Sequence, residues 1–259
     1  MEILVNKSIK LFSYIVKYDW GAAPNPYWGY CTLVICKPRI RNSTAVGNWI
    51  VGSGSANNPY DGKDYSNKII YAMKVTDVVE LEKYNEICLG KTDYGDKLAK
   101  KIPKYSSKNY PERMGDCIYY NISYEPKKAD MRLGVHGNDC LKRDLSSNKA
   151  LISNHYYYFG EKAIDIKGDL EPIIATTQGH RSNANKDYAQ EFIDWISSGE
   201  FNEFKNPHKP KPILEKFQNK LPKIEGDKPF RSPCDMNDDY REVVGWTCIN
   251  RKYKNKKII

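Results

Sequence analysis

The sequence lacks the cysteine and histidine spacings that hold metal ions or build disulfide frameworks. Its seven cysteines contain no CxxC pair, and its four histidines form neither an HxH nor an HExxH motif. Structural zinc sites and disulfide scaffolds both need such paired spacings. We therefore predict no metal site, no cofactor, and reduced, mostly buried thiols in a cytoplasmic protein.

Long apolar runs and nucleotide-binding loops are also missing. The apolar N-terminal stretch is interrupted by an asparagine and three lysines within residues 6–17, so it predicts neither a secretion signal nor a membrane span. The GSGS at residues 52–55 lacks the lysine-serine ending of a phosphate-binding loop and the context of a hydrolase serine. Its backbone amides can still face an anion, which makes Ser55 a candidate anion-binding residue.

Charge and composition point to one class of partner. Lys and Arg number 41 against 32 Asp and Glu, and the formal net charge is +9. A basic balance suits an anionic partner such as nucleic acid, although a solvated lysine-rich surface explains it equally well.

The spacing of apolar residues and of Pro and Gly predicts a strand-rich fold. Strands are expected at residues 11–18, 30–37, 46–53, 68–76, 116–120, 150–159, 163–166 and 242–247, and helices at 77–87 and 184–198. The lysine-rich residues 90–113 are interpreted as a mobile insertion. Because strands do not alternate regularly with helices, we expect an α+β fold. It has a mixed, mainly antiparallel β core or small barrel, helical insertions and a C-terminal helix.

The domain organisation expected from the sequence is simple. Residues 1–200 are predicted to form one principal domain. The Pro- and Lys-rich residues 201–259 are predicted to be an extension that packs on it.

Residues 18–55 carry an unusual mixture of aromatic, basic, Pro and Gly residues. Lys37, Arg39 and Arg41 lie in the sequence between Trp28 and Trp49. On an extended segment, Arg39 and Arg41 project to one side because side chains repeat every second residue. Cations that meet phosphates and rings that stack on bases would suit nucleic acid. The alternative is an edge strand with its tryptophans in the core.

Candidate catalytic residues are fewer. His155 and His180 lie in polar settings, SNHYYYFG and TQGHRSN, where a histidine can carry a proton or bind phosphate, or simply be hydrogen-bonded for structure. Asp19 is either an acid of the site or a residue that bonds its own turn. Cys31 and Cys36 both fall inside a predicted strand, which argues against a cysteine nucleophile. A polar connection that contains His136 and Arg143 receives no role.

Several phrases in order resemble a known family. YDWGAAPNPYWGYCTLVICKPRIR, VGNWIVGSGS, YSNKIIYAMKVTDVVELEKY, LISNHYYYFGEKAIDI and QGHRS are similar to the bacterial and phage family called nucleotide modification associated domain 2. The resemblance implies association with systems that make or handle modified DNA bases, and it brings no established activity. The order of strands and basic segment also resembles the PUA-like barrels, including the EVE and ASCH groups, which implies a base bound in an aromatic-lined pocket.

These observations lead to one leading hypothesis and two alternatives. We expect a binding module that recognises a modified base in a DNA-modification or phage-defence context, with DNA in preference to RNA, or a nucleotide, as its ligand. The predicted base pocket comprises Asp19, Asn25, Tyr27, Trp28, Trp49, Ser53, His155, Tyr157 and Phe159, and the predicted phosphate-binding residues are Lys37, Arg39, Arg41, Ser55, His180 and Arg181. The first alternative is an enzyme that processes a base or nucleotide with Asp19, His155 and His180. The second is a defence protein that senses a nucleotide signal.

Overall fold

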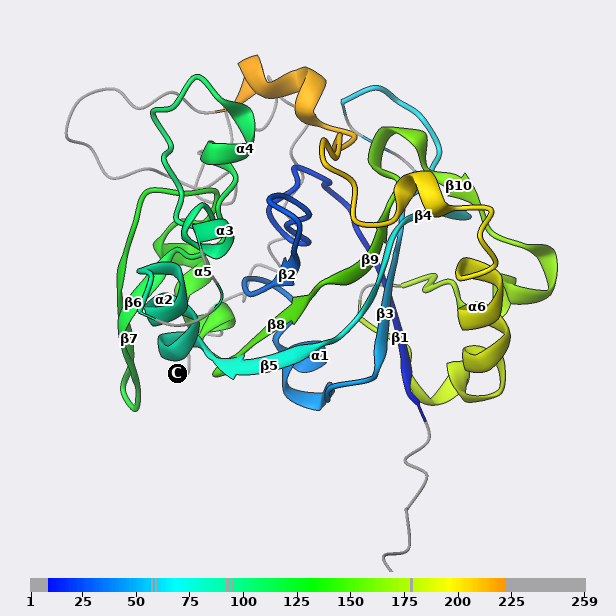
Figure 1. Ribbon diagram of the computed structural model, residues 1–259, viewed down its shortest axis with the longest axis horizontal. Helices are drawn as coiled ribbons and strands as arrows, with labels where there is room; N and C mark the ends of the chain where they lie inside the picture. The colour runs from blue at the N-terminus through cyan, green and yellow to red at the C-terminus, as the bar shows by residue number, and fades with distance from the viewer. Residues whose placement is uncertain are drawn as a thin grey trace, which may run out of the picture.

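The fold is built on three sheets that two long strand runs tie together (Figure 1). The computed structural model describes residues 9–221 except 57, 59, 92, 93, 95 and 178. The five-stranded sheet has the order β1-β3-β4-β10, with β9 also paired to β4. Its strands are β1 (Leu11–Ile15), β3 (Trp49–Ser53), β4 (Lys68–Lys74), β9 (His155–Tyr158) and β10 (Ile164–Asp165). β1 and β3 are parallel, and the other pairs are antiparallel.

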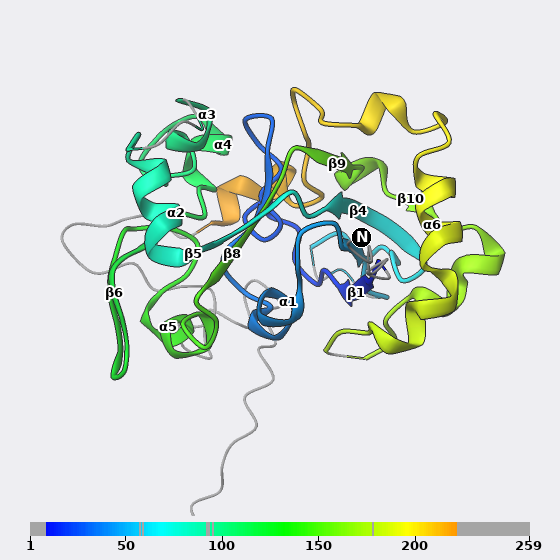
Figure 2. The ribbon, with the colours of Figure 1, turned by 60° about the horizontal axis from the view of Figure 1, so that its bottom comes forward.

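Two strand runs pass from this sheet into the next one. The three-stranded sheet has the order β2-β8-β5, formed by β2 (Cys31–Leu33), β8 (Lys149–Ser153) and β5 (Asp77–Glu80). β4 continues into β5 after two residues, and β8 continues into β9 after Asn154, so the two sheets follow each other along the molecule (Figure 2). The third sheet is the hairpin of β6 (Tyr119–Tyr124) and β7 (Lys127–Met131).

Short helices cover the two ends of this strand framework. α2 (Leu81–Cys88), α3 (Asp96–Ala99), α4 (Tyr110–Arg113) and α5 (Asn138–Asp144) gather near the hairpin, α6 (Ala189–Ile196) lies at the other end, and α1 (Pro38–Ser43) lies between β2 and β3 in sequence. Short 3-10 helices occupy Gly160–Lys162, Gly168–Ile173, Asn183–Tyr188, Asn202–Phe204 and Glu215–Lys220.

The five-stranded sheet is buried on both faces, which explains the nearly continuous apolar runs of its strands. Ile70 and Met73 of β4 face the larger core cluster, whereas Ile69 and Ala72 face a second cluster closed by α6. Phe192 and Ile196 on one side of α6 are fully buried in that second cluster.

The α+β class with a mainly antiparallel core is confirmed, and several element predictions are corrected. The described strands form no closed barrel. Residues 38–43 are helix α1 rather than an extended strand end, because Pro38 occupies the first helical position. The helix predicted at 77–87 begins as β5 and becomes helical only at Leu81, because residues 77–80 pair with β8. The strand predicted at 150–159 divides between two sheets.

The described part of residues 96–113, which was predicted to be a mobile insertion, packs into the protein. Leu98 and Tyr110 are buried, and the Lys101 side chain is fully enclosed. Its ammonium donates to the carbonyl and side-chain oxygens of Asn25 and to the carbonyl of Tyr30. The low apolar content of this segment did not indicate that it is buried. The reason is that a buried lysine with three acceptors takes the place of ordinary apolar contacts.

Two further predictions concern the C-terminal strand and membrane spans. The strand predicted at 242–247 lies outside the described residues. Within the described part of the chain, every helix is too short or too polar to cross a membrane.

Candidate active site

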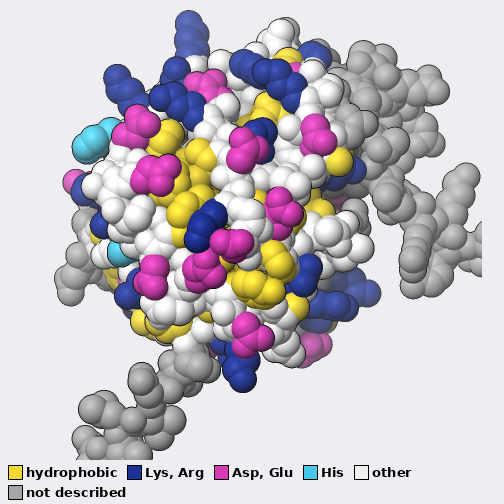
Figure 3. Space-filling view, turned by 90° about the vertical axis from the view of Figure 1, so that its right-hand side faces the viewer, with side chains coloured by type: hydrophobic (Ala, Val, Ile, Leu, Met, Phe, Trp, Pro, Cys, Tyr) yellow, Lys and Arg dark blue, Asp and Glu magenta, His cyan; other side chains and the backbone are white. Residues whose placement is uncertain are grey.

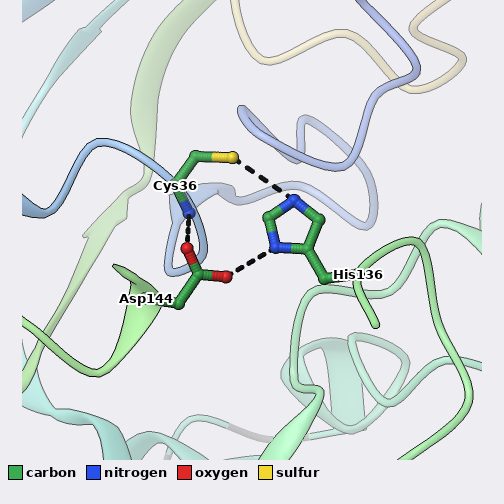
Figure 4. A group of neighbouring side chains, drawn as sticks. All are labelled: Cys36, His136 and Asp144. Carbon is green, nitrogen blue, oxygen red and sulfur yellow. Dashed lines mark hydrogen bonds and ion pairs between the residues drawn. The ribbon is translucent and has the colours of Figure 1, made fainter. Parts of the chain in front are cut away.

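Three side chains from two distant segments of the chain meet beyond the end of β2 (Figure 4). Cys36 follows β2, His136 lies two residues before α5, and Asp144 ends α5. Sγ of Cys36 lies 3.3 Å from Nε2 of His136, and Nδ1 of the same ring lies 2.5 Å from Oδ2 of Asp144. One imidazole therefore joins a thiol to a carboxylate.

The carboxylate of Asp144 is held in place by hydrogen bonds and orients the imidazole of this group. Its side chain is fully buried, and each carboxylate oxygen accepts from two donors. Oδ1 accepts from the backbone N–H of Cys36 at 3.0 Å and from Nε of Arg143 at 3.2 Å. Oδ2 accepts from His136 and, at 3.0 Å, from the hydroxyl of Tyr119. A carboxylate with this many donors has no freedom to turn, so it sets the orientation of the imidazole.

The backbone at Cys36 adopts an unusual turn. Cys36 has φ 62° and Lys37 has φ 41°, so two successive non-glycine residues are left-handed before Pro38 begins α1. Such conformations cost on the order of 1–3 kcal/mol each and persist only where the surroundings hold them. The turn takes the chain out of β2 and places the thiol beside His136. The prediction that Cys36 lies inside a strand is therefore wrong, because β2 ends at Leu33.

Arg41 stabilises this turn through hydrogen bonds to backbone carbonyls. Its side chain is fully buried, and its guanidinium donates to the carbonyls of Cys36, Asp144, Lys149 and, at the longer distance of 3.4 Å, Ser147. Every one of these acceptors is backbone, so Arg41 ties α1 to the end of α5. Sequence reasoning placed Arg41 on a phosphate-facing edge. The helical turn instead directs it inward, which removes the side chain from solvent.

The electrostatics of the group favour a thiolate beside an imidazolium. Burial by itself raises the pKa of the Cys36 thiol, but the charge and hydrogen bond of His136, together with Arg143, outweigh it and leave the pKa below its ordinary value. Burial lowers the pKa of His136, yet Cys36 and Asp144 raise it to about 10. Burial also opposes the Asp144 charge, but His136 and two arginines hold its pKa well below the usual range. All three shifts favour the charged forms, so a thiolate, an imidazolium and a carboxylate in series stabilise one another.

This arrangement suits nucleophilic catalysis better than metal binding. The three ligand atoms lie within 4.8 Å of one another, close enough for a metal. However, Cys36 contacts Nε2 and Asp144 contacts Nδ1, on different edges of the imidazole ring, so one ion on the Cys36 side would have a thiolate and one nitrogen from this group. Structural and catalytic zinc sites take three or four protein ligands. A thiolate, a histidine and a buried carboxylate in series instead form a nucleophile, a proton carrier and its orienting group.

The predicted aromatic pocket is only partly assembled. Trp49, His155 and Tyr157 lie together, with ring centroids 5.5 to 6.5 Å apart. Trp49 and Tyr157 are each 2% exposed and belong to the core cluster around α6. Phe159 is in the same cluster and packs on Phe204. Recognition of a base by these rings stays a prediction.

Of the other predicted pocket residues, Tyr27 belongs to the larger core cluster, and Asn25 and Ser53 are buried polar residues. Trp28 packs against that cluster beside Tyr27, with the ammonium of Lys100 4.9 Å from the centre of its ring. Asn25 is fully buried and donates to the carbonyl of Met114. The hydroxyl of Ser53 donates to the carbonyl of Tyr14. Their described contacts are structural.

Asp19, His155 and His180 have different surroundings. Asp19 is buried, where its carboxylate accepts from the hydroxyl of Tyr158 and the backbone N–H of Ile213. The ring of His180 lies 6.0 Å from that of Phe12. The contacts of the described residues thus give these three side chains no common partner.

The burial and contacts of Asp19 predict how the stability of the protein depends on pH. Burial raises the pKa of Asp19 from 3.8 to about 6, against hydrogen bonds from Tyr158 and Ile213. The folded state therefore binds this proton more tightly than the unfolded state, and the free energy of unfolding falls as pH rises through that interval. An asparagine can donate to Tyr158 and accept from Ile213, so Asp19→Asn mimics the protonated form. We expect the wild type to lose about 1 kcal/mol relative to Asp19→Asn between pH 5 and pH 7.5 in urea unfolding. Parallel pH dependences would contradict a buried, titrating Asp19.

The predicted phosphate-binding residues also divide. Lys37 and Arg39 flank the start of α1, next to Cys36, and Arg39 is exposed. Arg181 bonds the carbonyl of Ile174, and its backbone pairs with Ser13. The backbone of Ser55 bonds to Tyr65.

The comparisons with known proteins bear on this site. The sequence model described as nucleotide modification associated domain 2 matches residues 8–219. The chain belongs to this family. The match contains Cys36, His136 and Asp144, so the proposed active site lies inside the family domain. Searches of curated proteins and of solved structures gave no match.

Sequence reasoning missed Cys36, His136 and Asp144. One signal was available: a cysteine two residues before Pro38, at the point where an apolar strand gives way to a helix-starting proline. Another was His136 in a Gly-Val-His-Gly stretch just before a short helical pattern. Neither signal shows that the two residues meet, because 100 residues separate them.

Proposed function

We propose that this family member is an enzyme of nucleotide modification in which Cys36 is the covalent nucleophile. The observation that carries the proposal is the continuous series from Cys36 through His136 to the buried Asp144. The family supplies the nucleotide-modification context. A nucleic acid or nucleotide, predicted from the sequence as the ligand, is the molecule on which the enzyme acts.

The reaction class that fits is acyl transfer. The Cys36 thiolate attacks the carbonyl carbon of an acyl group, and a C–S bond forms. The C–N or C–O bond to the leaving group then breaks, and Nε2 of His136 gives its proton to the departing nitrogen or oxygen. Water or a second amine next gives a proton to His136 and attacks the thioester, which releases the acyl group and restores the thiolate. Asp144 keeps the imidazole in position throughout.

Arg143 supplies positive charge at the same place. Its Nη2 lies 3.9 Å from Sγ of Cys36, and its Nε bonds Asp144. The backbone N–H of Cys36 is already bonded to Asp144, so it is not free to stabilise an oxyanion. The Arg143 guanidinium faces the thiolate together with the His136 imidazolium and is placed to stabilise developing negative charge.

The test is a covalent intermediate on Cys36. The protein is incubated with deoxynucleosides and nucleotides whose exocyclic amines carry acyl or aminoacyl groups, then acid-quenched and weighed by mass spectrometry. We expect an added acyl mass on the Cys36 peptide, absent from Cys36→Ala. Lys142→Ala, at an exposed position of α5 beside the same group, is the matched control and should form the adduct as the wild type does. Product formation that continues in Cys36→Ala would contradict the proposal.

A further inference from the structure

Positive charge is concentrated around the Cys36 thiolate. Lys37 is its neighbour in sequence, and Arg143 reaches to 3.9 Å from Sγ while its side chain is 47% exposed. Arg39 follows Pro38 and is exposed on α1. These side chains come from two separate segments, α5 and the start of α1, that the Asp144 and Arg41 contacts join.

The edge strand β1 brings His180 close to Lys37. Phe12 and Tyr14 point to one face of β1 because they are two residues apart. The ammonium of Lys37 lies 4.5 Å from the centre of the Tyr14 ring, and the His180 ring lies 6.0 Å from that of Phe12. A pair of backbone hydrogen bonds between Ser13 and Arg181 holds the His180 segment against β1. Lys37 and His180 are thus neighbours along the strand.

Lys37 and Arg39 differ from Arg143, which is paired with the carboxylate of Asp144. Among the residues that the structure describes, no carboxylate forms an ion pair with Lys37 or Arg39. Burial lowers the pKa of His180, and the charges of Arg39 and Lys37 lower it further. The opposite situation appears on the face over α6, where acidic and basic side chains are interspersed (Figure 3). Uncompensated cations beside a nucleophile create a field that favours an anion there.

We propose that Lys37, Arg39 and His180 bind a phosphate group of the Cys36 substrate, which is therefore a phosphate-bearing nucleotide, free or within a DNA strand. This inference rests on the proposed function. Lys37 and Arg39 meet the phosphate as cations, His180 donates a hydrogen bond, and Arg143 stays with the thiolate. The phosphate is held on the β1 side of Cys36, so the acyl-bearing base reaches the thiol from there.

The field can be measured without the natural substrate. Iodoacetate is an anion and iodoacetamide is neutral, and both alkylate the same thiolate. The ratio of their rate constants at Cys36 reports the local charge. We expect this ratio to exceed that of glutathione and to fall roughly fivefold for each cation removed in Lys37→Gln and Arg39→Gln. It should also fall as salt is raised.

The matched control is the double variant Lys127→Gln/Lys128→Gln, which removes two exposed lysines from the β7 hairpin. Its ratio should equal that of the wild type. A wild-type ratio no higher than that of glutathione, or an unchanged ratio in the Lys37 and Arg39 variants, would overturn the phosphate site. Failure of Cys36 to react with either reagent would instead remove the proposed nucleophile itself.

Protection of Cys36 from iodoacetamide identifies the source of the phosphate. The probes are thymidine, thymidine 5′-monophosphate, a single-stranded 12-mer and the corresponding duplex. Protection by the monophosphate or by a strand, weakened in Lys37→Gln/Arg39→Gln, supports the proposal, and whichever phosphate compound protects at the lower concentration indicates the source. Equal protection by thymidine, or none by any probe, overturns it.

Discussion

Cys36 is expected to react with iodoacetamide at pH 6 on the order of tenfold to a hundredfold faster than glutathione. A thiol with an ordinary pKa is almost entirely protonated at this pH, whereas the charge and hydrogen bond of His136 lower the pKa of the Cys36 thiol and so raise its thiolate fraction. The increase in alkylation rate is smaller than the increase in thiolate fraction, because a less basic thiolate is also a weaker nucleophile. The rate should level off at a lower pH than the rate for glutathione, because His136, with its pKa raised to about 10, stays protonated while the Cys36 thiol ionises. Peptide mapping of the alkylated protein assigns the site.

Variants separate the triad from a merely exposed cysteine. Cys31, Cys88, Cys117 and Cys140 are buried and should not react in the folded protein. Cys234 and Cys248 lie outside the described residues, so both are replaced by serine in the test background. His136→Gln should move the onset of Cys36 alkylation to higher pH, because burial, which raises the pKa of the thiol, is then no longer outweighed by His136. A rate at pH 6 that is the same in wild type and His136→Gln would contradict the ion pair, and a rate raised by a chelator would reveal a bound metal.

Arg41→Met is expected to lower the free energy of unfolding by roughly 3–5 kcal/mol. The substitution keeps much of the apolar stem but removes the donors to the carbonyls of Cys36, Asp144, Lys149 and Ser147. Buried acceptors left without donors each cost about 1–3 kcal/mol. The left-handed turn at Cys36 would lose one of its anchors. Urea unfolding measures the change.

Arg39→Met is the matched control because it removes the same charge two residues earlier. Arg39 is exposed, so its stability should change by no more than about 0.5 kcal/mol. The pair distinguishes a structural arginine from a ligand-binding one: Arg41→Met should destabilise, and Arg39→Met should weaken reaction with iodoacetate. Wild-type stability in Arg41→Met, together with lost anion preference, would restore the phosphate role first predicted for Arg41.

The turn at Cys36 and the buried Asp144 show how the fold builds a reactive centre from unfavourable parts. Two left-handed residues and a buried carboxylate are each costly alone. Asp144 accepts from the N–H of Cys36 and Arg41 donates to the carbonyl of the same residue, so the turn and the buried charge stabilise each other. The thiolate is then held by groups whose positions the core already determines.

Local patterns in the sequence determined the strand-rich α+β class, most strand positions and the family. The strands predicted at 11–18, 46–53 and 68–76 contain β1, β3 and β4, because long apolar stretches with Gly and Pro boundaries depend on nearby residues alone. The basic character of residues 37–39 next to a strand end was also visible. Sequence patterns misjudged α1 and β5, where a proline at the first helical position and pairing with β8 decided the conformation.

Only the tertiary structure decided which polar residues meet. Cys36 and His136 are 100 residues apart, and their contact depends on where β2 ends, how the turn at Lys37 bends, and how Arg41 and Asp144 join α1 to α5. None of these contacts has a repeating pattern along the chain. The same tertiary contacts turned Arg41 inward and left Lys37 and Arg39 beside the thiol, because a helical turn, unlike a strand, sends residues 39 and 41 in different directions.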